Sequence, residues 1–176
     1  MKLFKKLAAA ALAAVLALTM VGCGSSASLK DELLKLAMDR MTVAGSTATH
    51  SKELDALAAK LVQEADKAAA AHKGDAAKTI LTDDAVVEAA GINTNANGYI
   101  LNAAPNVQFK SSGMSYMELI KMEWMQDAIN PRTDHGSNRA KEIGTITLGN
   151  NVDIGVAMGK IGGKEYVVIL YTNHAA

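Results

Sequence analysis

The apolar residues of this chain change their spacing once, near residue 140, and this change restricts the fold more than any other feature of the sequence. Before it, apolar residues recur as they do on one face of an α-helix. After it, the segments 142–148, 152–160 and 164–172 are rich in Val, Ile, Thr and Tyr and are separated by turn sequences. Helices first and strands last predict an α+β fold, a layered α-β-α sandwich that ends in an antiparallel β-meander.

Two long segments near the start carry the helical pattern. The first begins at Leu29 and ends before Gly45, and the second begins after Ser51 and continues to about His72. His72 lies about five turns of roughly 3.6 residues after Leu54. We therefore expect His72 on the buried stripe of the second helix, pointing at the rim of the core.

A third helix opens with a capping box, in which Ser115 and Glu118 each satisfy a free backbone donor. Trp124, the chain's only tryptophan, lies on the apolar face of this helix. A core anchor is its simplest interpretation, and a ligand-stacking tryptophan is the alternative. The Asn-rich residues 92–113 indicate loops with a short strand that begins at Tyr99.

The first residues have the layout of an export signal. Three lysines are followed by an uncharged apolar run, 7–21, which is shorter than the roughly 20 residues of a permanent membrane span. The run ends in Met20-Val21-Gly22-Cys23, which resembles the lipobox of bacterial lipoproteins. The alternative is a simple secretory signal followed by an incidental cysteine.

The lipobox resemblance implies cleavage before Cys23 and attachment of lipid, such as palmitate, to that cysteine. Residues 1–22 are then a signal peptide, 23–28 are the lipidated cysteine and a flexible tether, and 29–176 form a single domain. We expect this domain at the extracytoplasmic face of a cell membrane. Because the chain has one cysteine, no internal disulfide forms and an apolar core must supply the stability.

The charge balance argues against a nucleic-acid partner. The chain has 18 basic and 18 acidic side chains, and removal of the three signal lysines leaves a net charge near −3. No block of like charge follows Cys23, so the lipid is the expected membrane attachment.

Four motifs occur in a consistent order along the chain. They are Ala37-Met38-Asp39-Arg40, Ser51–Ala58, Glu123–Asp127 with Pro131–His135, and Ile154-Gly155-Val156 with Gly163–Val168. Together they resemble the CAP superfamily, the extracellular domain of cysteine-rich secretory proteins, pathogenesis-related proteins and bacterial SCP-like proteins. The resemblance implies a layered α-β-α fold and a ligand cleft at His72 and His135, with Trp124 and Tyr99 beside them.

In family members, cleft histidines and a glutamate of a Gly-Glu-Asn motif can hold a divalent metal. The matching segment here, Asn97-Gly98-Tyr99-Ile100, contains no glutamate. The resemblance still leaves zinc at His72 and His135 as a hypothesis, with Glu118 or Glu123 as the acidic partner or catalytic acid and base.

The sequence therefore predicts a membrane-anchored CAP-like lipoprotein that binds a small apolar or lipid ligand, a peptide, or a cell-envelope partner near His72 and His135. Binding is favoured over enzymatic activity, since signatures of common hydrolases and nucleotide-binding proteins are absent from the sequence. A divergent metal-dependent hydrolase or peptidase and a purely structural envelope lipoprotein are the alternatives. His50 and His174 are assigned no role.

Overall fold

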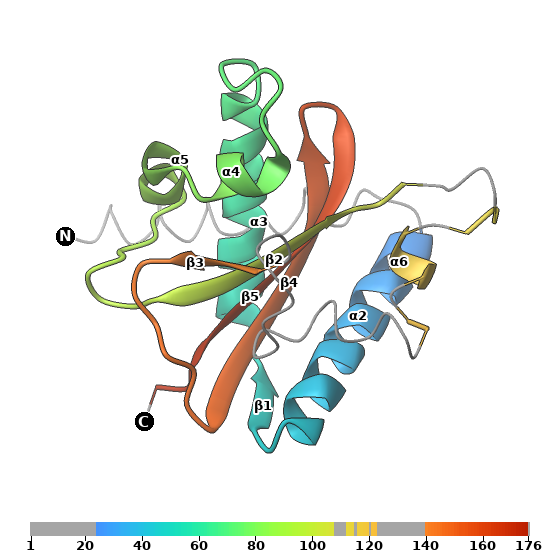
Figure 1. Ribbon diagram of the computed structural model, residues 1–176, viewed down its shortest axis with the longest axis vertical. Helices are drawn as coiled ribbons and strands as arrows, with labels where there is room; N and C mark the ends of the chain where they lie inside the picture. Colours follow the sequence, from blue (N-terminus) through green and yellow to red (C-terminus); the bar gives the residue numbers. More distant parts are fainter. Residues whose placement is uncertain (1–23, 108–111, 115, 120, 123–139, 176) are drawn as a thin grey trace, which may run out of the picture.

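A five-stranded mixed sheet lies at the centre of the computed structural model, which describes residues 24–107, 112–114, 116–119, 121–122 and 140–175 (Figure 1). In the sheet the strands follow the order β1-β4-β5-β2-β3. The elements in chain order are α2 (Gly24–Val43), β1 (Thr47–His50), α3 (Lys52–Ala68), α4 (Ala77–Leu81), α5 (Asp84–Ala89), β2 (Tyr99–Pro105), α6 (Tyr116–Leu119), β3 (Ala140–Ile143), β4 (Asn151–Ile161) and β5 (Lys164–Asn173).

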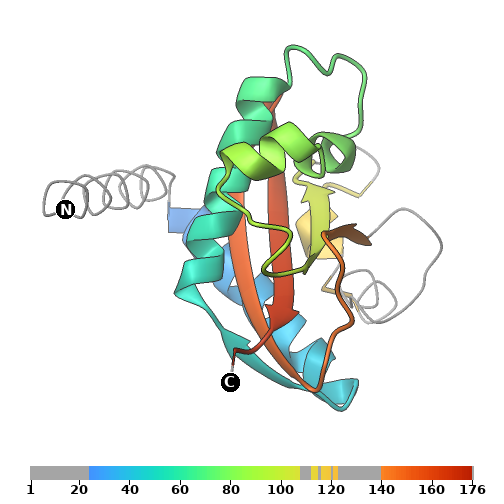
Figure 2. The ribbon, with the colours of Figure 1, turned by 90° about the vertical axis from the view of Figure 1, so that its left-hand side faces the viewer.

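Helices cover both faces of this sheet, and the α+β class predicted from the sequence is confirmed (Figure 2). On one face α3, α4 and α5 share an apolar cluster with residues of β2, β4 and β5. On the other face α2 packs against side chains of β4 and β5. Strand β1 pairs parallel to β4, and the remaining pairs are antiparallel.

The strands after residue 140 are connected differently from the expected meander. The tight turn at Gly162 and Gly163, both with positive φ, joins β4 to β5 in the expected hairpin. However, β3 pairs with β2 at the far edge of the sheet rather than with β4. The expectation of three successive strands is wrong because β5 occupies one side of β4 and β1 occupies part of the other.

Both long helices differ from their expected bounds. Helix α2 includes Gly24–Ser28, the residues expected to form a flexible tether. Glycine and serine each cost a helix less than about 1 kcal/mol relative to alanine, so a helix that is anchored by its packed stripe extends through them. Helix α3 begins as expected, with the Ser51 hydroxyl accepting a hydrogen bond from the Leu54 amide, but it ends at Ala68.

His72 therefore lies in a turn beyond α3 and not on its buried stripe, which corrects the expectation for this residue. The physical reason is the end of the sheet beneath the helix. The turn after β4 lies beside Ala69, and Ala70 and Ala71 are exposed, so there is no further apolar surface here for the helix to bury.

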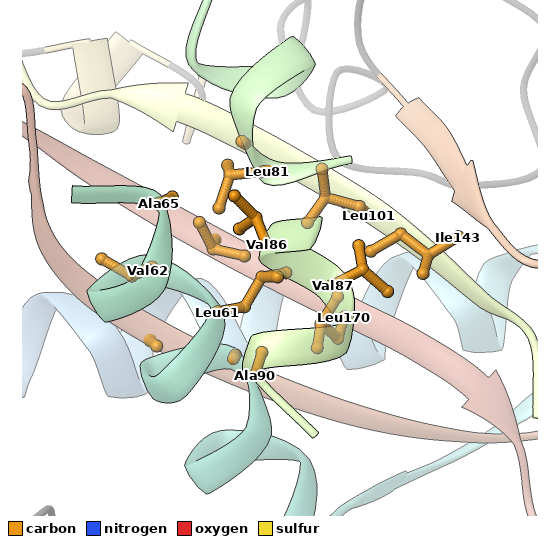
Figure 3. Packing of buried hydrophobic residues seen from close by; sticks show 14 of the residues in the cluster. Leu61, Val62, Ala65, Leu81, Val86, Val87, Ala90, Leu101, Ile143 and Leu170 are labelled. Atoms are coloured by element: carbon orange, nitrogen blue, oxygen red, sulfur yellow. The ribbon is translucent and has the colours of Figure 1, made fainter. Parts of the chain in front are cut away.

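Helix α3 lies close to β4 because two glycines of that strand face it. A Cβ built on Gly155 would lie 2.4 Å from the backbone carbon of Leu54, and one on Gly159 would lie 2.7 Å from Val62 Cγ1. Leu61, on the same helix, enters the cluster shared with α5, β2 and β5 (Figure 3). The glycines thus set the distance between the helix layer and the sheet.

A valine at position 155 tests this contact. Since the added Cβ would lie 2.4 Å from the backbone of Leu54, we expect Gly155→Val to lower the free energy of unfolding by about 3 kcal/mol. Urea unfolding of the two proteins measures the difference. Gly149→Ala is the matched control, because its new Cβ lies 3.4 Å from the nearest atom; a similar loss in both variants would contradict the proposed close contact.

Candidate functional site

The structure places two residues of the predicted cleft at different ends of the sheet. His72 is beside the β4–β5 turn, since α3 reaches that turn through a 2.9 Å hydrogen bond from the Gly162 amide to Asp66 Oδ1. Tyr99 starts β2 at the other end, where the Thr172 hydroxyl donates to the carbonyl of Gly98. His72 and Tyr99 therefore do not share one pocket.

Each of these two side chains has a local environment that explains it without a ligand. His72 Nδ1 lies 3.1 Å from Asp75 Oδ2 in the turn after α3. Tyr99 is 8% exposed and belongs to the apolar cluster under α3. The first is an ordinary surface pair and the second is a core residue.

Of the remaining predicted site residues, the structure describes only Glu118. Cys23, Glu123, Trp124 and His135 lie outside the described residues. Glu118 lies in the short helix α6 and is exposed. Among the described residues, no three His, Cys, Asp or Glu side chains are grouped as metal ligands, and no helix is long and apolar enough to cross a membrane.

A carboxylate in the first turn of α3, that of Asp55, is bonded to groups of three other elements. Its Oδ2 atom lies 2.8 Å from Lys30 Nζ and 2.9 Å from His50 Nε2. Its Oδ1 atom accepts a 2.7 Å hydrogen bond from the Val156 amide. These three bonds join α2, β1 and β4 to α3 through a side chain that is 17% exposed. We call Lys30, His50 and Asp55 the edge cluster.

The sheet topology explains why an aspartate is needed there. Strand β1 ends at His50, opposite Ile154, while β4 continues to Ile161. The amide of Val156 therefore lies on the side of β4 that β1 covers up to Ile154, but beyond the end of β1, where no strand pairs with it. Because a buried amide without an acceptor costs about 1–3 kcal/mol, the Asp55 carboxylate replaces the missing strand at this position.

A second carboxylate–histidine pair lies near the edge cluster. His174 Nδ1 is 2.7 Å from Asp153 Oδ1, and the amide of His174 donates to the carbonyl of Asn151. Asp153 is the β4 partner of Thr49, the residue before His50. Two histidines that the sequence left without a role thus both pair with aspartates around β1.

The chemistry of the edge cluster differs from that of an open catalytic site. A carboxylate that holds one imidazole nitrogen orients the ring for acid–base work at the other nitrogen. In the edge cluster, however, both oxygens of Asp55 are engaged by protein donors from three elements. We therefore assign Asp55 a structural role that joins the two helix layers around the edge of the sheet.

Sequence reasoning missed the edge cluster because its members are distant in sequence and its geometry depends on β1. The four residues of β1 are mostly exposed and have no strong apolar alternation. Asp55 follows the buried Leu54 and resembles an ordinary solvent-facing residue of an amphipathic helix. The one available signal was its place in the first turn of α3, where acidic residues are common for a different reason.

A shallow hollow on the outer side of α2 is lined by Glu32, Lys35, Leu36, Asp39 and Lys121. An ion pair between Lys121 and Glu32 crosses it. Four of the five side chains are charged, which is unlike the apolar lining of a lipid-binding pocket.

Tyr171 has a clear shift of its titration. It is fully buried on the α2 face of the sheet, and desolvation by burial raises the pKa of its phenol far above the ordinary value of 10.0. The folded protein thus keeps Tyr171 neutral under conditions in which an exposed tyrosine ionises.

Removal of the Asp55 carboxylate tests the edge cluster. We expect Asp55→Ala to lower the free energy of unfolding by about 2 kcal/mol, because the Val156 amide loses its acceptor. Asp153→Ala is the matched control, and we expect a loss below about 1 kcal/mol because its partner His174 is half exposed. Urea unfolding measures both changes, and equal losses would contradict the special role of Asp55.

Alkaline pH tests the burial of Tyr171. A raised folded-state pKa contributes stability that is complete below the unfolded pKa, near 10, and is lost as pH rises above it. We expect a loss of up to about 1.4 kcal/mol per pH unit above about pH 10 from this group. Tyr171→Phe is expected to remove this pH dependence of the unfolding free energy, whereas Tyr166→Phe, at a half-buried tyrosine, is expected to retain it. Urea unfolding at successive pH values compares the slopes of unfolding free energy against pH.

Comparison of the chain with family models, curated proteins and solved structures found no match in any of the three.

Proposed function

We propose that this protein is a lipid-anchored, extracytoplasmic lipoprotein that is attached to a bacterial membrane through Cys23. The observation that carries the proposal is the segment that ends in Met20-Val21-Gly22-Cys23, after a basic start and an uncharged apolar run. Cys23 is the chain's only cysteine and stands where the lipid would be attached.

The domain after the anchor is proposed to be CAP-like. The order of its elements supports this: two successive long helices, and a terminal hairpin that contains Ile154-Gly155-Val156 in β4. Helices on both faces of the sheet agree with the layered α-β-α arrangement that the resemblance implies. Ala37 and Tyr99-Ile100 depart from the family pattern at the Asn-x-x-Arg and Gly-Glu-Asn motifs.

For the activity, we propose binding of an apolar or lipid ligand, a peptide, or an envelope partner. The CAP resemblance supports binding, since some members bind lipids and sterols. His135 and Trp124 remain the proposed cleft residues, while the hydrogen bond of His72 to Asp75 and the burial of Tyr99 give these two residues other roles.

Replacement of Cys23 tests the anchoring. When the full chain is expressed in a bacterium, we expect the parent to be recovered in the membrane fraction with the mass of residues 23–176 plus a diacylglyceryl group and acyl chains. Cys23→Ala is expected to lose this added mass and the membrane association. Ser26→Ala is the matched control and should behave as the parent, because it leaves the cysteine in place.

The same purified protein tests the binding activity. Native mass spectrometry of the detergent-solubilised parent is expected to show a co-purified ligand that organic extraction removes, and Trp124→Ala should reduce its occupancy. A parent that is lipidated but carries no ligand in these spectra would argue for the structural-lipoprotein alternative. A parent that is soluble and unmodified would contradict the anchoring itself.

A further inference from the structure

The only Asn-Gly pair of the sequence, Asn97-Gly98, lies in the turn that leads into β2. The side chain of Asn97 is exposed, and its amide group forms no hydrogen bond with any of the residues that the structure describes. The backbone amide of Asn97 donates a 3.1 Å hydrogen bond to the carbonyl of Asn93. Asn97 is thus fixed at its backbone, while its side chain is open to water.

The residue after Asn97 has to be a glycine for a steric reason. A Cβ built on Gly98 would overlap the carbonyl oxygen of Thr145 and would lie 2.7 Å from Ile146 Cβ. The carbonyl of Gly98 accepts a hydrogen bond from the Thr172 hydroxyl, whereas its amide nitrogen has no acceptor within the described ranges. The fold therefore keeps an unblocked backbone nitrogen directly after an exposed asparagine.

This arrangement permits a reaction between the two residues. The Gly98 nitrogen gives its proton to solvent base and attacks the amide carbon of the Asn97 side chain. A new C–N bond closes a succinimide ring, the bond from that carbon to the side-chain nitrogen breaks, and this nitrogen leaves as ammonia with a proton taken from water. A water molecule then adds to either carbonyl carbon of the ring and one C–N bond breaks, which gives isoaspartate or aspartate.

Two physical factors favour this reaction at Asn97 over the other exposed asparagines. The attack is intramolecular, so the two reacting atoms are held at a high effective concentration. Glycine has no Cβ, which leaves the space beside its nitrogen open and allows more backbone conformations than any other residue. Asn95, in the same exposed turn, is followed by Ala96, whose Cβ hinders the corresponding attack.

We propose that Asn97 is a self-modification site, at which the folded protein loses ammonia through a succinimide and forms isoaspartate and aspartate. Water is the only other reactant. The proposal goes beyond the proposed function and does not depend on lipid at Cys23.

The isoaspartate product changes the fold locally, whereas aspartate adds only a surface charge. Isoaspartate lengthens the main chain by one methylene group immediately before Gly98. The contacts of Gly98 with Thr145 and Thr172 are close, and the next residue, Tyr99, is buried in the cluster under α3. The longer backbone therefore displaces the start of β2 from these contacts.

Incubation of the purified full chain in mildly alkaline buffer tests the modification. Peptide mass spectrometry with electron-transfer fragmentation locates the product and distinguishes isoaspartate from aspartate. We expect conversion at Asn97 to be at least severalfold faster than at Asn95, the matched control within the same turn, and to become faster as the pH rises. In heavy-oxygen water, the product should carry the label at residue 97.

Two results would overturn the inference. The first is conversion of Asn97 only after unfolding in urea, because the folded turn would then protect the pair. The second is equal conversion at Asn95 and Asn97. Asn97→Gln should remain unmodified, since its longer side chain would have to close a larger ring.

The displacement of β2 has its own measurement. Urea unfolding compares the incubated parent, which contains isoaspartate, with freshly purified Asn97→Asp, which has the same charge and an unchanged backbone. We expect the incubated parent to unfold at a lower urea concentration. Equal midpoints would contradict the proposed effect of isoaspartate on the start of β2.

Discussion

The close contact between α3 and β4 is the constraint on which the rest of the structure depends. Gly155 and Gly159 allow the helix backbone to approach the strand, and no larger side chain fits at Gly155 without moving Leu54. Two aspartates separated by about three helical turns fix the helix along the strand, since Asp55 accepts from the Val156 amide and Asp66 from the Gly162 amide. The glycines set the distance and the carboxylates set the register.

This contact also determines how the opposite layer is attached. Because Asp55 is held at the edge of β4, its second oxygen can reach Lys30 of α2 and His50 of β1. The two helix layers are therefore connected by a polar bridge around the sheet as well as by the apolar side chains that each buries against it. An isolated surface ion pair contributes little stability, but the buried amide makes this carboxylate costly to remove.

The parts of the fold that the sequence predicts are those governed by local periodicity. The amphipathic stripe that begins after Ser51 predicts α3, and the Gly162-Gly163 turn predicts the hairpin, because both depend on neighbouring residues. Strand β1 is not predicted from the sequence because its partner lies about 100 residues away and its side chains are mostly exposed. The end of α3 before His72 is not predicted for a related reason, because the helix ends where the sheet beneath it ends.

The candidate site likewise combines a feature predicted from neighbouring residues with one that depends on distant contacts. Cys23 is proposed from a local motif, whereas the pairing of His50 with Asp55 depends on where β1 ends relative to β4. Helix α2 connects these two features physically. Its described residues begin at Gly24, it packs Leu33 and Met41 into the α2-side core, and Lys30 binds it to the edge of the sheet. Helix α2 thus connects the N-terminal side of the described chain to β4, the strand against which both helix layers pack.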